Sequence, residues 1–325
     1  MSLSKEIKRK AIELGFDLVG ITDASPIDTR QVEMLSRWLK SGCAGQMSYM
    51  HNNFEKRTQP ALLLENAQSV ICAGLNYKPP KKNPKQPDTT VQTGKVASYA
   101  QYEDYHPFIK ERLHKLTEFI GSAGERRHKF KICVDSVPLA ERSLAARAGL
   151  GFIGKNRMLI NPELGPQIFL GEIITTIKLS TDKPIKQNCS NCDKCIGACP
   201  THALTPDEQF DANKCINYLT IEYKGRIPPE LAEKTGDRIF GCNECIIACP
   251  YQTNATVRKN KQFKLYNNRA RLDLRRILNF TQQDFDAEFA DSAIRRSGLE
   301  RLKRNARICL ENINRKSNYE SFVRE

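Results

Sequence analysis

The chain has 325 residues, of which 27% are charged, and a formal net charge of +14. Lys or Arg interrupts every apolar run before it reaches the length of a membrane span, and the N-terminus lacks the apolar core of an export signal. These features exclude a membrane protein and predict a cytoplasmic protein of two or three packed units.

Helix and strand patterns alternate through the first 180 residues. Helices are predicted at residues 4–14, 31–40, 108–120 and 139–148, and a glycine closes each of the first two. Strands are predicted at 17–22, 69–77, 129–134 and 169–177, and the proline- and lysine-rich segment 78–95 is predicted to be a surface loop. This alternation favours an α/β sheet domain over residues 1–180.

Gly149, Gly151 and Gly154 have the spacing of a dinucleotide-binding loop, and Lys155 extends the match towards a phosphate-binding loop. Both motifs require a strand before the glycines and a helix that starts at them. Here a predicted helix precedes the glycines, an extended segment follows, and Asn156 replaces the magnesium-binding hydroxyl. The glycines are therefore predicted to end a helix and to allow close approach of the backbone.

Residues 189–249 contain eight cysteines, in two runs and one isolated position. The first run has C-x₂-C-x₂-C-x₃-C-P spacing, the second has C-x₂-C-x₃-C-P spacing, and Cys215 lies between them. In ferredoxins the first three cysteines of such a run bind one [4Fe–4S] cluster, and the cysteine before proline binds the other. The spacing predicts one cluster on Cys189, Cys192, Cys195 and Cys249, and a second on Cys199, Cys215, Cys242 and Cys245.

Two other uses of these cysteines agree less well with the spacing. A zinc ribbon needs two separated pairs of ligands for each metal ion, not a triple followed by Cys-Pro. Disulfides require an oxidising compartment, and no export signal points to one. Of the cysteines outside the two sets, Cys72 and Cys133 lie in apolar strands and are predicted to be small buried side chains.

Beyond residue 256 the pattern becomes helical, at 272–278 and 292–312, and positive charge accumulates. Residues 251–325 carry 17 Lys and Arg against 9 Asp and Glu. This excess suits a polyanionic partner such as a nucleic acid, and it suits a solvated helical surface without a partner equally well. The sequence predicts a two-cluster domain at 181–255 and a basic helical region at 256–325.

Cubane clusters transfer single electrons and rarely perform difficult organic chemistry alone. A large α/β domain beside two clusters is therefore predicted to hold the group that receives the electrons. A flavin, a corrinoid or an external partner would each satisfy this arrangement, and residue spacing does not distinguish them.

Four segments resemble a known family: residues 134–156, the cysteine block, residues 215–228 and residues 235–245. The first reads VDSVPLAERSLAARAGLGFIGKN, the third reads CINYLTIEYKGRIP and the last reads TGDRIFGCNEC. Together they resemble epoxyqueuosine reductases, and the resemblance extends from the first helix to about Asn312.

The resemblance implies a cobalamin-dependent enzyme with two [4Fe–4S] clusters. Such enzymes reduce epoxyqueuosine to queuosine at the wobble position of tRNA, the last step of queuosine biosynthesis. The implied fold is α+β or α/β: a nitroreductase-like corrinoid-binding domain, a ferredoxin-like domain and a short C-terminal helical region. Longer members continue into HEAT-like repeats, and this chain is expected to be a short form, monomeric, served by a low-potential electron donor of the flavodoxin or ferredoxin type.

Asp135 is the predicted catalytic acid. It follows a buried strand, at the end of the sheet where α/β domains place ligands, and the resemblance assigns the proton donor to this position. On the residues alone, a cap for the following helix is an alternative. The resemblance implies that no histidine binds cobalt. His106 is therefore predicted to start a helix and not to act as a ligand. The implied cofactor-binding residues are Arg57, Asp135, Lys155, Asn156, Leu159 and Asn217.

Contacts with tRNA are predicted in two places. The segment after Cys215 combines aromatic rings with positive charge, which suits an unstacked base, and residues 293–307 place arginines at helical spacing for phosphates. A solvated basic helix face is the alternative for both. The candidate residues are Tyr218, Tyr223, Lys224, Arg226, Arg296 and Arg304.

Two other functions remain open from the sequence. A corrinoid iron–sulfur reductase of another substrate, such as a small organohalide, would use the same cofactors but would gain nothing from the basic C-terminal region. A ferredoxin-like electron carrier would have no use for the large α/β domain.

Overall fold

The computed structural model describes residues 2–80, 91–123, 128–207 and 209–324. Its contacts divide the chain into two compact units, each assembled from three separate segments. These boundaries differ from the ranges predicted from the sequence, and they divide the cysteine-rich segment between the units. The first unit comprises Met1–Lys78, Tyr105–Cys195 and Cys245–Phe263, and the second comprises Pro79–Asp104, Ile196–Glu244 and Lys264–Glu325.

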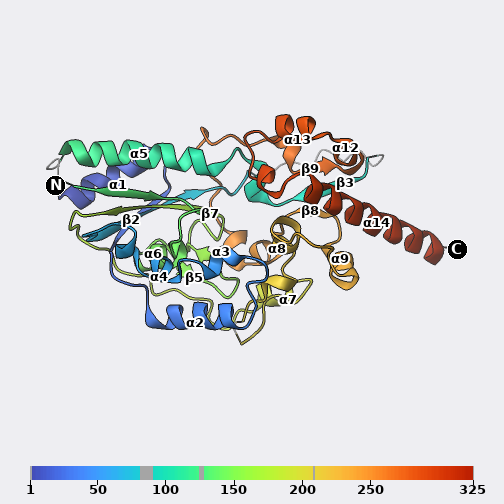
Figure 1. Ribbon diagram of the computed structural model, residues 1–325, viewed down its shortest axis with the longest axis horizontal. Helices are drawn as coiled ribbons and strands as arrows, with labels where there is room; N and C mark the ends of the chain where they lie inside the picture. The colour runs from blue at the N-terminus through green and yellow to red at the C-terminus, as the bar shows by residue number, and fades with distance from the viewer. Residues whose placement is uncertain (1, 81–90, 124–127, 208, 325) are drawn as a thin grey trace. The chain divides into compact units, whose positions relative to one another are not determined.

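The first unit contains a four-stranded sheet with the order β1-β2-β7-β4, and its central strands β2 and β7 are labelled in Figure 1. The central strands β2 and β7 are buried along their whole length. All four strands were predicted from the sequence, and the observed bounds lie within two residues of the predicted ones. The strands are β1 (Leu18–Asp23), β2 (Ser69–Asn76), β4 (Phe130–Cys133) and β7 (Ile168–Thr175).

Every strand pairing in this sheet is antiparallel. Two parallel neighbours begin at the same end of the sheet, so a crossover must carry the chain back to that end. Here the helical segment after β1 enters β2 at the end where β1 finishes, and the two strands run in opposite directions. The unit is therefore α+β, which corrects the α/β architecture that the alternation favoured. The register places Glu172 of β7 beside Cys72 of β2 and Cys133 of β4, on one face of the sheet.

Helices cover both faces of this sheet (Figure 1). On one face α1 (Leu3–Glu13) packs with α5 (Tyr105–Ala123), and the Ile109 and Leu113 side chains of α5 lie against Gly171. On the other face lies α6 (Glu141–Arg147). With α2 (Thr29–Lys40), these are the four predicted helices, so all of them are confirmed. Short helices complete the unit: α3 (Ser48–His51), α4 (Phe54–Thr58) and α11 (Pro250–Thr253), with α7 (Lys194–Gly197) and α10 (Glu244–Ile247) where the chain passes between units.

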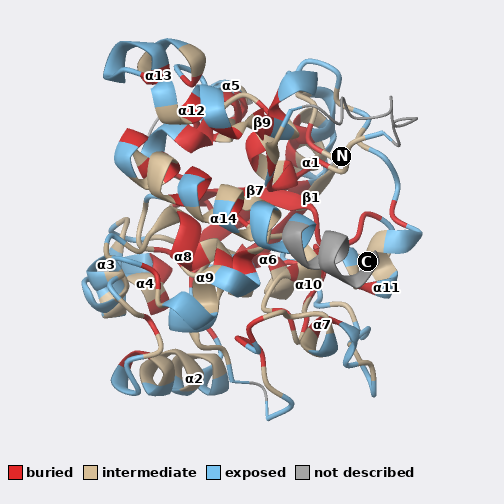
Figure 2. Cartoon of the chain, turned by 90° about the vertical axis from the view of Figure 1, so that its right-hand side faces the viewer, coloured by how far each residue is buried: buried red, intermediate tan, exposed pale blue. Residues whose placement is uncertain are grey.

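An apolar layer fills the space between α6 and the sheet. Val70, Leu144, Leu170 and Ile174 are buried in it, and red marks the buried residues of β7 and part of β1 in Figure 2. Glu172 belongs to the same face and is 0% exposed. A fully buried carboxyl in an apolar layer is rare unless it is paired.

The glycine-rich segment forms no nucleotide-binding loop, as predicted. Helix α6 ends at Arg147, and an antiparallel hairpin of β5 (Phe152–Ile153) and β6 (Leu159–Ile160) follows. A Cβ atom on Gly151 would lie 2.5 Å from the carbonyl oxygen of Ile160. This glycine is therefore needed for close approach of the chain's own hairpin.

The second unit is built on a three-stranded sheet with the order β8-β3-β9. These strands are β3 (Thr93–Val96), β8 (Arg238–Phe240) and β9 (Arg271–Asp273). Strand β3 lies at the end of the segment that was predicted to be a loop, and residues 81–90 of that segment lie outside the described residues. The short polar strand carried no alternating apolar pattern that would have revealed it.

Helices and an apolar core surround this second sheet. The core includes Phe240, Phe285, Phe289 and Leu302. The helix predicted at 272–278 begins only at Leu274, and the one predicted at 292–312 begins with a 3-10 turn. The helices are α8 (Ile216–Ile221), α9 (Pro229–Thr235), α12 (Leu274–Asn279), α13 (Gln282–Glu288) and α14 (Leu299–Arg324).

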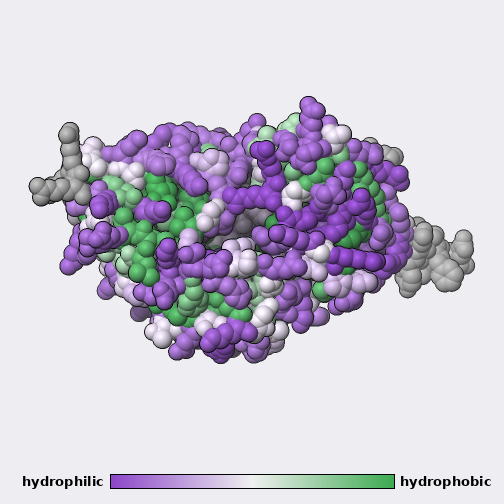
Figure 3. Space-filling view, in the orientation of Figure 1, coloured by the Kyte–Doolittle hydropathy of each residue, from purple (hydrophilic) through white to green (hydrophobic). Residues whose placement is uncertain are grey.

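Among the described residues, no helix has both the length and the apolar character needed to cross a membrane. Hydrophilic side chains dominate the face shown in Figure 3, with smaller apolar patches between them.

Candidate active site

Four cysteines of the first unit line a single pocket. They are Cys189, Cys192, Cys195 and Cys249, the set predicted for the first cluster. Burial raises the pKa of the Cys195 and Cys249 thiols, so these thiols are protonated until a metal displaces the proton. Within the described part of the chain, no three Cys, His, Asp or Glu side chains converge closely enough to bind one metal ion.

Two predicted cofactor residues line the same pocket. The backbone N–H of Lys155 donates to the Cys189 sulfur at 3.4 Å, and the Lys155 ammonium pairs with Asp193. The Asn156 amide donates to the carbonyl oxygen of Cys245 at 3.2 Å. Amide donors aimed at cluster sulfurs tune the reduction potential of iron–sulfur proteins. The geometry links both residues to the cysteine pocket.

In the second unit, Cys199, Cys215 and Cys242 lie close enough to interact electrostatically. These are three of the four cysteines predicted for the second cluster, and Cys245 belongs to the first unit. Burial raises the pKa of Cys215 to about 11. The backbone N–H of Ala203 donates to the Cys199 sulfur at 3.3 Å, as Lys155 does for Cys189.

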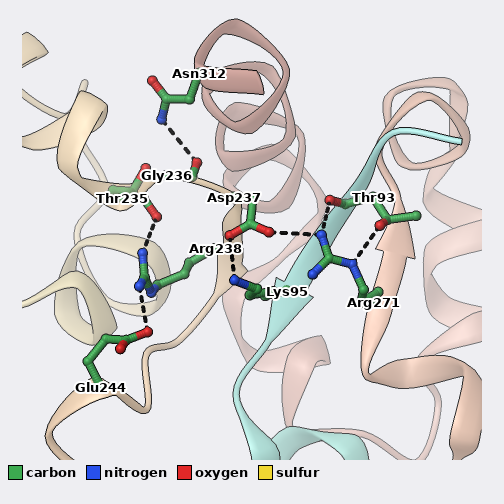
Figure 4. Close-up of polar contacts among 9 residues, drawn as sticks. All are labelled: Thr93, Lys95, Thr235, Gly236, Asp237, Arg238, Glu244, Arg271 and Asn312. Carbon is green, nitrogen blue, oxygen red and sulfur yellow. Dashed lines mark hydrogen bonds and ion pairs between the residues drawn. The ribbon is translucent and has the colours of Figure 1, made fainter. Parts of the chain in front are cut away.

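The segment that carries Cys242 is anchored by ion pairs (Figure 4). The Arg238 guanidinium binds Glu244 at 2.5 Å and the carbonyl oxygen of Thr235 at 3.0 Å. Asp237 accepts from Arg271 at 2.8 Å and pairs with Lys95 at 3.2 Å. Strand β8 is thereby fixed on both sides of its backbone, which holds Cys242 in a defined place.

Asp135 follows β4 with a left-handed backbone conformation, φ +52°. Its side chain is 50% exposed and its Oδ2 atom lies 3.1 Å from Nε2 of His106, near the start of α5. Its backbone N–H donates to Oε1 of Glu141 at 2.6 Å. A non-glycine residue in this region is uncommon and is held there by its surroundings.

The alternative role of Asp135, as the cap of helix α6, does not occur. The N-cap residue of α6 is Ala140, and no side chain caps the helix there. His106 begins α5 as predicted, but it is buried and its ring contacts Asp135. The side chain of Asp135 is therefore directed to His106 and to solvent.

Arg57 lies close to this aspartate. Its carbonyl oxygen accepts from the Ala140 N–H at 3.0 Å, and its guanidinium interacts electrostatically with Glu141 and Asp135. One guanidinium nitrogen donates to the carbonyl oxygen of Tyr49, whereas Nε is buried with no hydrogen-bond partner among the described residues. A buried donor without a partner fits a polar ligand at this place.

The other implied cofactor residues are placed differently. Leu159 belongs to β6 and is 3% exposed in the core, so only its backbone could reach a ligand. Asn217 lies in the second unit, beside Gly241. In the first unit, Arg57 and Asp135 thus bring polar groups close together, and Lys155 and Asn156 line the cysteine pocket.

The candidate tRNA residues differ in exposure. Tyr218 is only 4% exposed and Tyr223 is half-buried, so the structure does not present the Tyr218 ring to an unstacked base. Tyr218 instead packs beside Tyr223, with ring centroids 6.1 Å apart. Lys224, Arg226 and Arg296 are exposed, as a contact with phosphate requires.

Arg304 binds the protein's own backbone. Its guanidinium donates to the carbonyl oxygens of Tyr223 and Gly225, both at 2.7 Å, and of Leu219 at 2.6 Å. It also binds the Asn305 side chain. Arg304 therefore has a structural role, because its donors hold the loop that carries Lys224.

We expect Arg304→Ala to lower the free energy of unfolding by about 1–3 kcal/mol, since buried carbonyl groups lose their donor. Exposed Arg226 provides the matched control, and Arg226→Ala should change stability by less than about 0.5 kcal/mol. Chemical denaturation of both variants measures the difference. Equal stability of the two would contradict the structural role of Arg304.

Comparisons with known proteins agree with this geometry. Residues 57–136 match the family described as "Epoxyqueuosine reductase QueG, DUF1730", and residues 188–252 match "4Fe-4S double cluster binding domain". An epoxyqueuosine reductase of Leadbetterella byssophila is 40% identical over 93% of this chain and 96% of its own length. The chain belongs to the epoxyqueuosine reductase family.

Other members of the epoxyqueuosine reductase family match almost as closely. The Escherichia coli K12 enzyme is 36% identical over 95% of this chain and 81% of its own length. The structure of the Streptococcus thermophilus enzyme superposes with a TM-score of 0.88 and 31% identity, covering 96% of this chain and 82% of the other. A structure of epoxyqueuosine reductase with an epoxyqueuosine-modified tRNA-Tyr stem loop gives the same TM-score, with 95% and 81% coverage. The chain is thus an oxidoreductase with the fold of this family.

Two acidic residues near Asp135 were not singled out from the sequence. Glu141 begins α6 and Glu172 lies in the middle of β7. The signal for Glu172 was present, since it is the only charged residue in the strand sequence IFLGEIIT.

Proposed function

We propose that this protein reduces epoxyqueuosine to queuosine at the wobble position of tRNA, with cobalamin and two [4Fe–4S] clusters as cofactors. The observation that carries the proposal is the similarity to epoxyqueuosine reductases over more than nine-tenths of the chain. The tRNA stem loop in the structure of a relative supports RNA as the substrate.

The reaction converts an epoxide to an alkene and releases water, which consumes two electrons and two protons. Cobalamin, when bound, supplies a low-potential cobalt centre that can engage the epoxide. Asp135 donates a proton to the departing oxygen. Its exposed carboxyl, placed beside Arg57 and His106, supports this role.

The two clusters would pass electrons one at a time from an external low-potential donor of the flavodoxin or ferredoxin type. Cys189, Cys192, Cys195 and Cys249 would bind the first cluster, and their shared pocket supports this set. Cys199, Cys215, Cys242 and Cys245 would bind the second. The corrinoid would be held by Lys155, Asn156, Arg57, Asn217 and the backbone at Leu159.

The tRNA would be held through exposed basic side chains. Lys224, Arg226 and Arg296 are the residues we propose for phosphate contacts, and half-buried Tyr223 for contact with a base. Arg304 would act indirectly, by holding the loop of Tyr223 and Lys224.

Anaerobic reconstitution tests the proposal. The purified protein is loaded with iron, sulfide and cobalamin, reduced chemically and incubated with tRNA that contains epoxyqueuosine. We expect nucleoside analysis to show conversion to queuosine, with none when cobalamin is omitted. Two clusters without bound corrinoid and without conversion would favour an electron carrier, and bound corrinoid with conversion of an organohalide alone would favour another reductase.

We also propose that the segment that carries Asp135 moves into and out of the active site. A structure of the Bacillus subtilis epoxyqueuosine reductase, which has 30% identity and a TM-score of 0.88, is described with its catalytic aspartate loop swung out of the active site. The left-handed conformation of Asp135 and its bond to Glu141 are consistent with a segment that has a defined working position.

A further inference from the structure

Glu172 is an ionisable residue inside an apolar layer. It is 0% exposed, and among the described residues no N–H or hydroxyl group bonds to either of its carboxyl oxygens. A carboxylate without donors in such a place is strongly destabilising. Glu172 is therefore expected to carry a proton in the folded protein.

Among the described residues, the immediate neighbours of Glu172 provide no compensating positive charge. Cys72 and Cys133 flank it in the sheet, and burial raises the pKa of both thiols, which leaves them neutral. Arg147, in the last turn of α6, uses its guanidinium on the backbone of Asp23 and on Thr22. The uncharged surroundings favour the neutral acid.

The polar neighbour of Glu172 is the Glu141 carboxyl. The Glu141 carboxyl lies close enough to raise the pKa of Glu172, through its charge and through a hydrogen bond that a neutral Glu172 can donate. Ionised carboxylates only accept hydrogen bonds, so this bond exists only while the pair holds a proton. Two adjacent buried carboxyls share one proton because both cannot ionise together at low cost.

The pair is connected to the active-site aspartate. Oε1 of Glu141 accepts the backbone N–H of Asp135 at 2.6 Å, and Asp135 has the uncommon left-handed conformation at this point. Removal of Glu141 would leave this N–H without its acceptor. Asp135 would then lose the contact that favours its present backbone conformation.

We propose that Glu141 and Glu172 form a buried carboxyl pair that shares one proton and, through the Asp135 backbone, holds the Asp135 side chain in its working position. Glu141 and Glu172 are thus positioning residues. The claim that Asp135 has a working position rests on the proposed function. The shared proton and the hydrogen bond from the Asp135 N–H to Glu141 do not depend on it.

The pair should depend on pH in a defined direction. Burial is the largest cause that raises the pKa of both carboxyls, to about 7 for Glu141; the hydrogen bond from the Asp135 N–H and the charges of Arg142 and Arg57 oppose the rise, and the Asp135 charge adds to it. Because the pKa of Glu172 is raised the more strongly, the pair keeps its shared proton below that raised pKa and loses it as pH rises through it. Above it, repulsion between the two carboxylates should displace Glu141 and release Asp135.

Infrared spectroscopy tests the shared proton without any substrate. The reconstituted wild-type protein should show the carbonyl band of a neutral carboxylic acid at pH 7, and the band should disappear at higher pH. Glu172→Gln should lack the band at pH 7 and above, and Glu163→Gln, at an exposed position, should retain it at pH 7. A wild-type protein without this band, or a band that survives in Glu172→Gln, would overturn the shared proton.

Hydrogen exchange tests the link to Asp135. Glu141→Ala should lower protection of the Asp135 amide by about tenfold, the change expected for one lost hydrogen bond. Glu141→Gln keeps an acceptor and should retain protection. At alkaline pH, the Asp135 amide should stay protected from exchange in Glu172→Gln. In the wild-type protein at the same pH, this amide should lose its protection. Unchanged protection in Glu141→Ala would overturn the positioning role.

Turnover separates this inference from the proposed function. If wild-type protein converts epoxyqueuosine, Glu141→Ala should lower kcat more than it changes KM, and Glu141→Gln should restore it in part. Undiminished kcat in Glu141→Ala would contradict the positioning role. A wild-type protein that fails to convert epoxyqueuosine, yet shows the expected band and exchange, would refute the proposed function and leave the carboxyl pair standing.

Discussion

Asp135→Asn is expected to lower turnover of epoxyqueuosine-containing tRNA by about 10²- to 10⁴-fold, the range typical for loss of a general acid. The amide has nearly the same shape as the carboxyl but cannot release a proton to the departing oxygen. Asparagine also tolerates the left-handed backbone found at this position, so the fold should be retained. Single-turnover kinetics on chemically reduced protein measures the effect.

The control for this experiment is Asp28→Asn. Asp28 caps α2 by accepting the Arg30 N–H at 2.9 Å, and asparagine is an equally good cap. Turnover and stability should both be unchanged in this variant. If Asp135→Asn turned over at the wild-type rate with its cofactors bound, another residue would have to be the acid.

Cys215→Ala is expected to abolish turnover and to remove one of two clusters. Iron content should fall from about eight to about four atoms per chain, since each cubane holds four. The Cys189 set should keep its cluster, because Cys215 is not among the residues that line that pocket. Electron paramagnetic resonance of the reduced protein should then show one cluster without coupling to a second.

Two further variants test which cysteines belong to which cluster. Cys249→Ala should remove the other cluster, so the two variants should retain clusters with different spectra. Cys43→Ala should keep full iron content, because Cys43 belongs to neither set. Unaltered iron content and spectra in Cys215→Ala would falsify the partition of cysteines between the clusters.

Much of this site was predictable because its residues belong to local patterns. The cysteine spacing predicted the four-thiol pocket before any contact was known, and strand bounds in the first unit followed from apolar segments such as residues 69–76. The position of Asp135 after β4 was also predicted, although the sheet is antiparallel and the argument from parallel sheets does not apply.

The rest depended on contacts between distant segments. Nothing near Arg304 in the sequence shows that its guanidinium binds carbonyl groups 79 to 85 residues away. Tyr218 has the composition of an RNA contact, yet its helix faces a core and buries the ring. Strand β3 contains only four residues and is defined by its partners β8 and β9.

The interleaving of the two units has a consequence for biosynthesis of the protein. The first unit includes residues up to Phe263, and the second begins at Pro79. N-terminal domains commonly fold on the ribosome before synthesis of the next domain begins. Neither unit can do so here, because neither is a contiguous stretch of the chain. The cysteines of the first set span residues 189–249, so synthesis must have passed Cys249 before a complete ligand set can receive iron. Insertion of that cluster should therefore be a late step, coupled to completion of the fold.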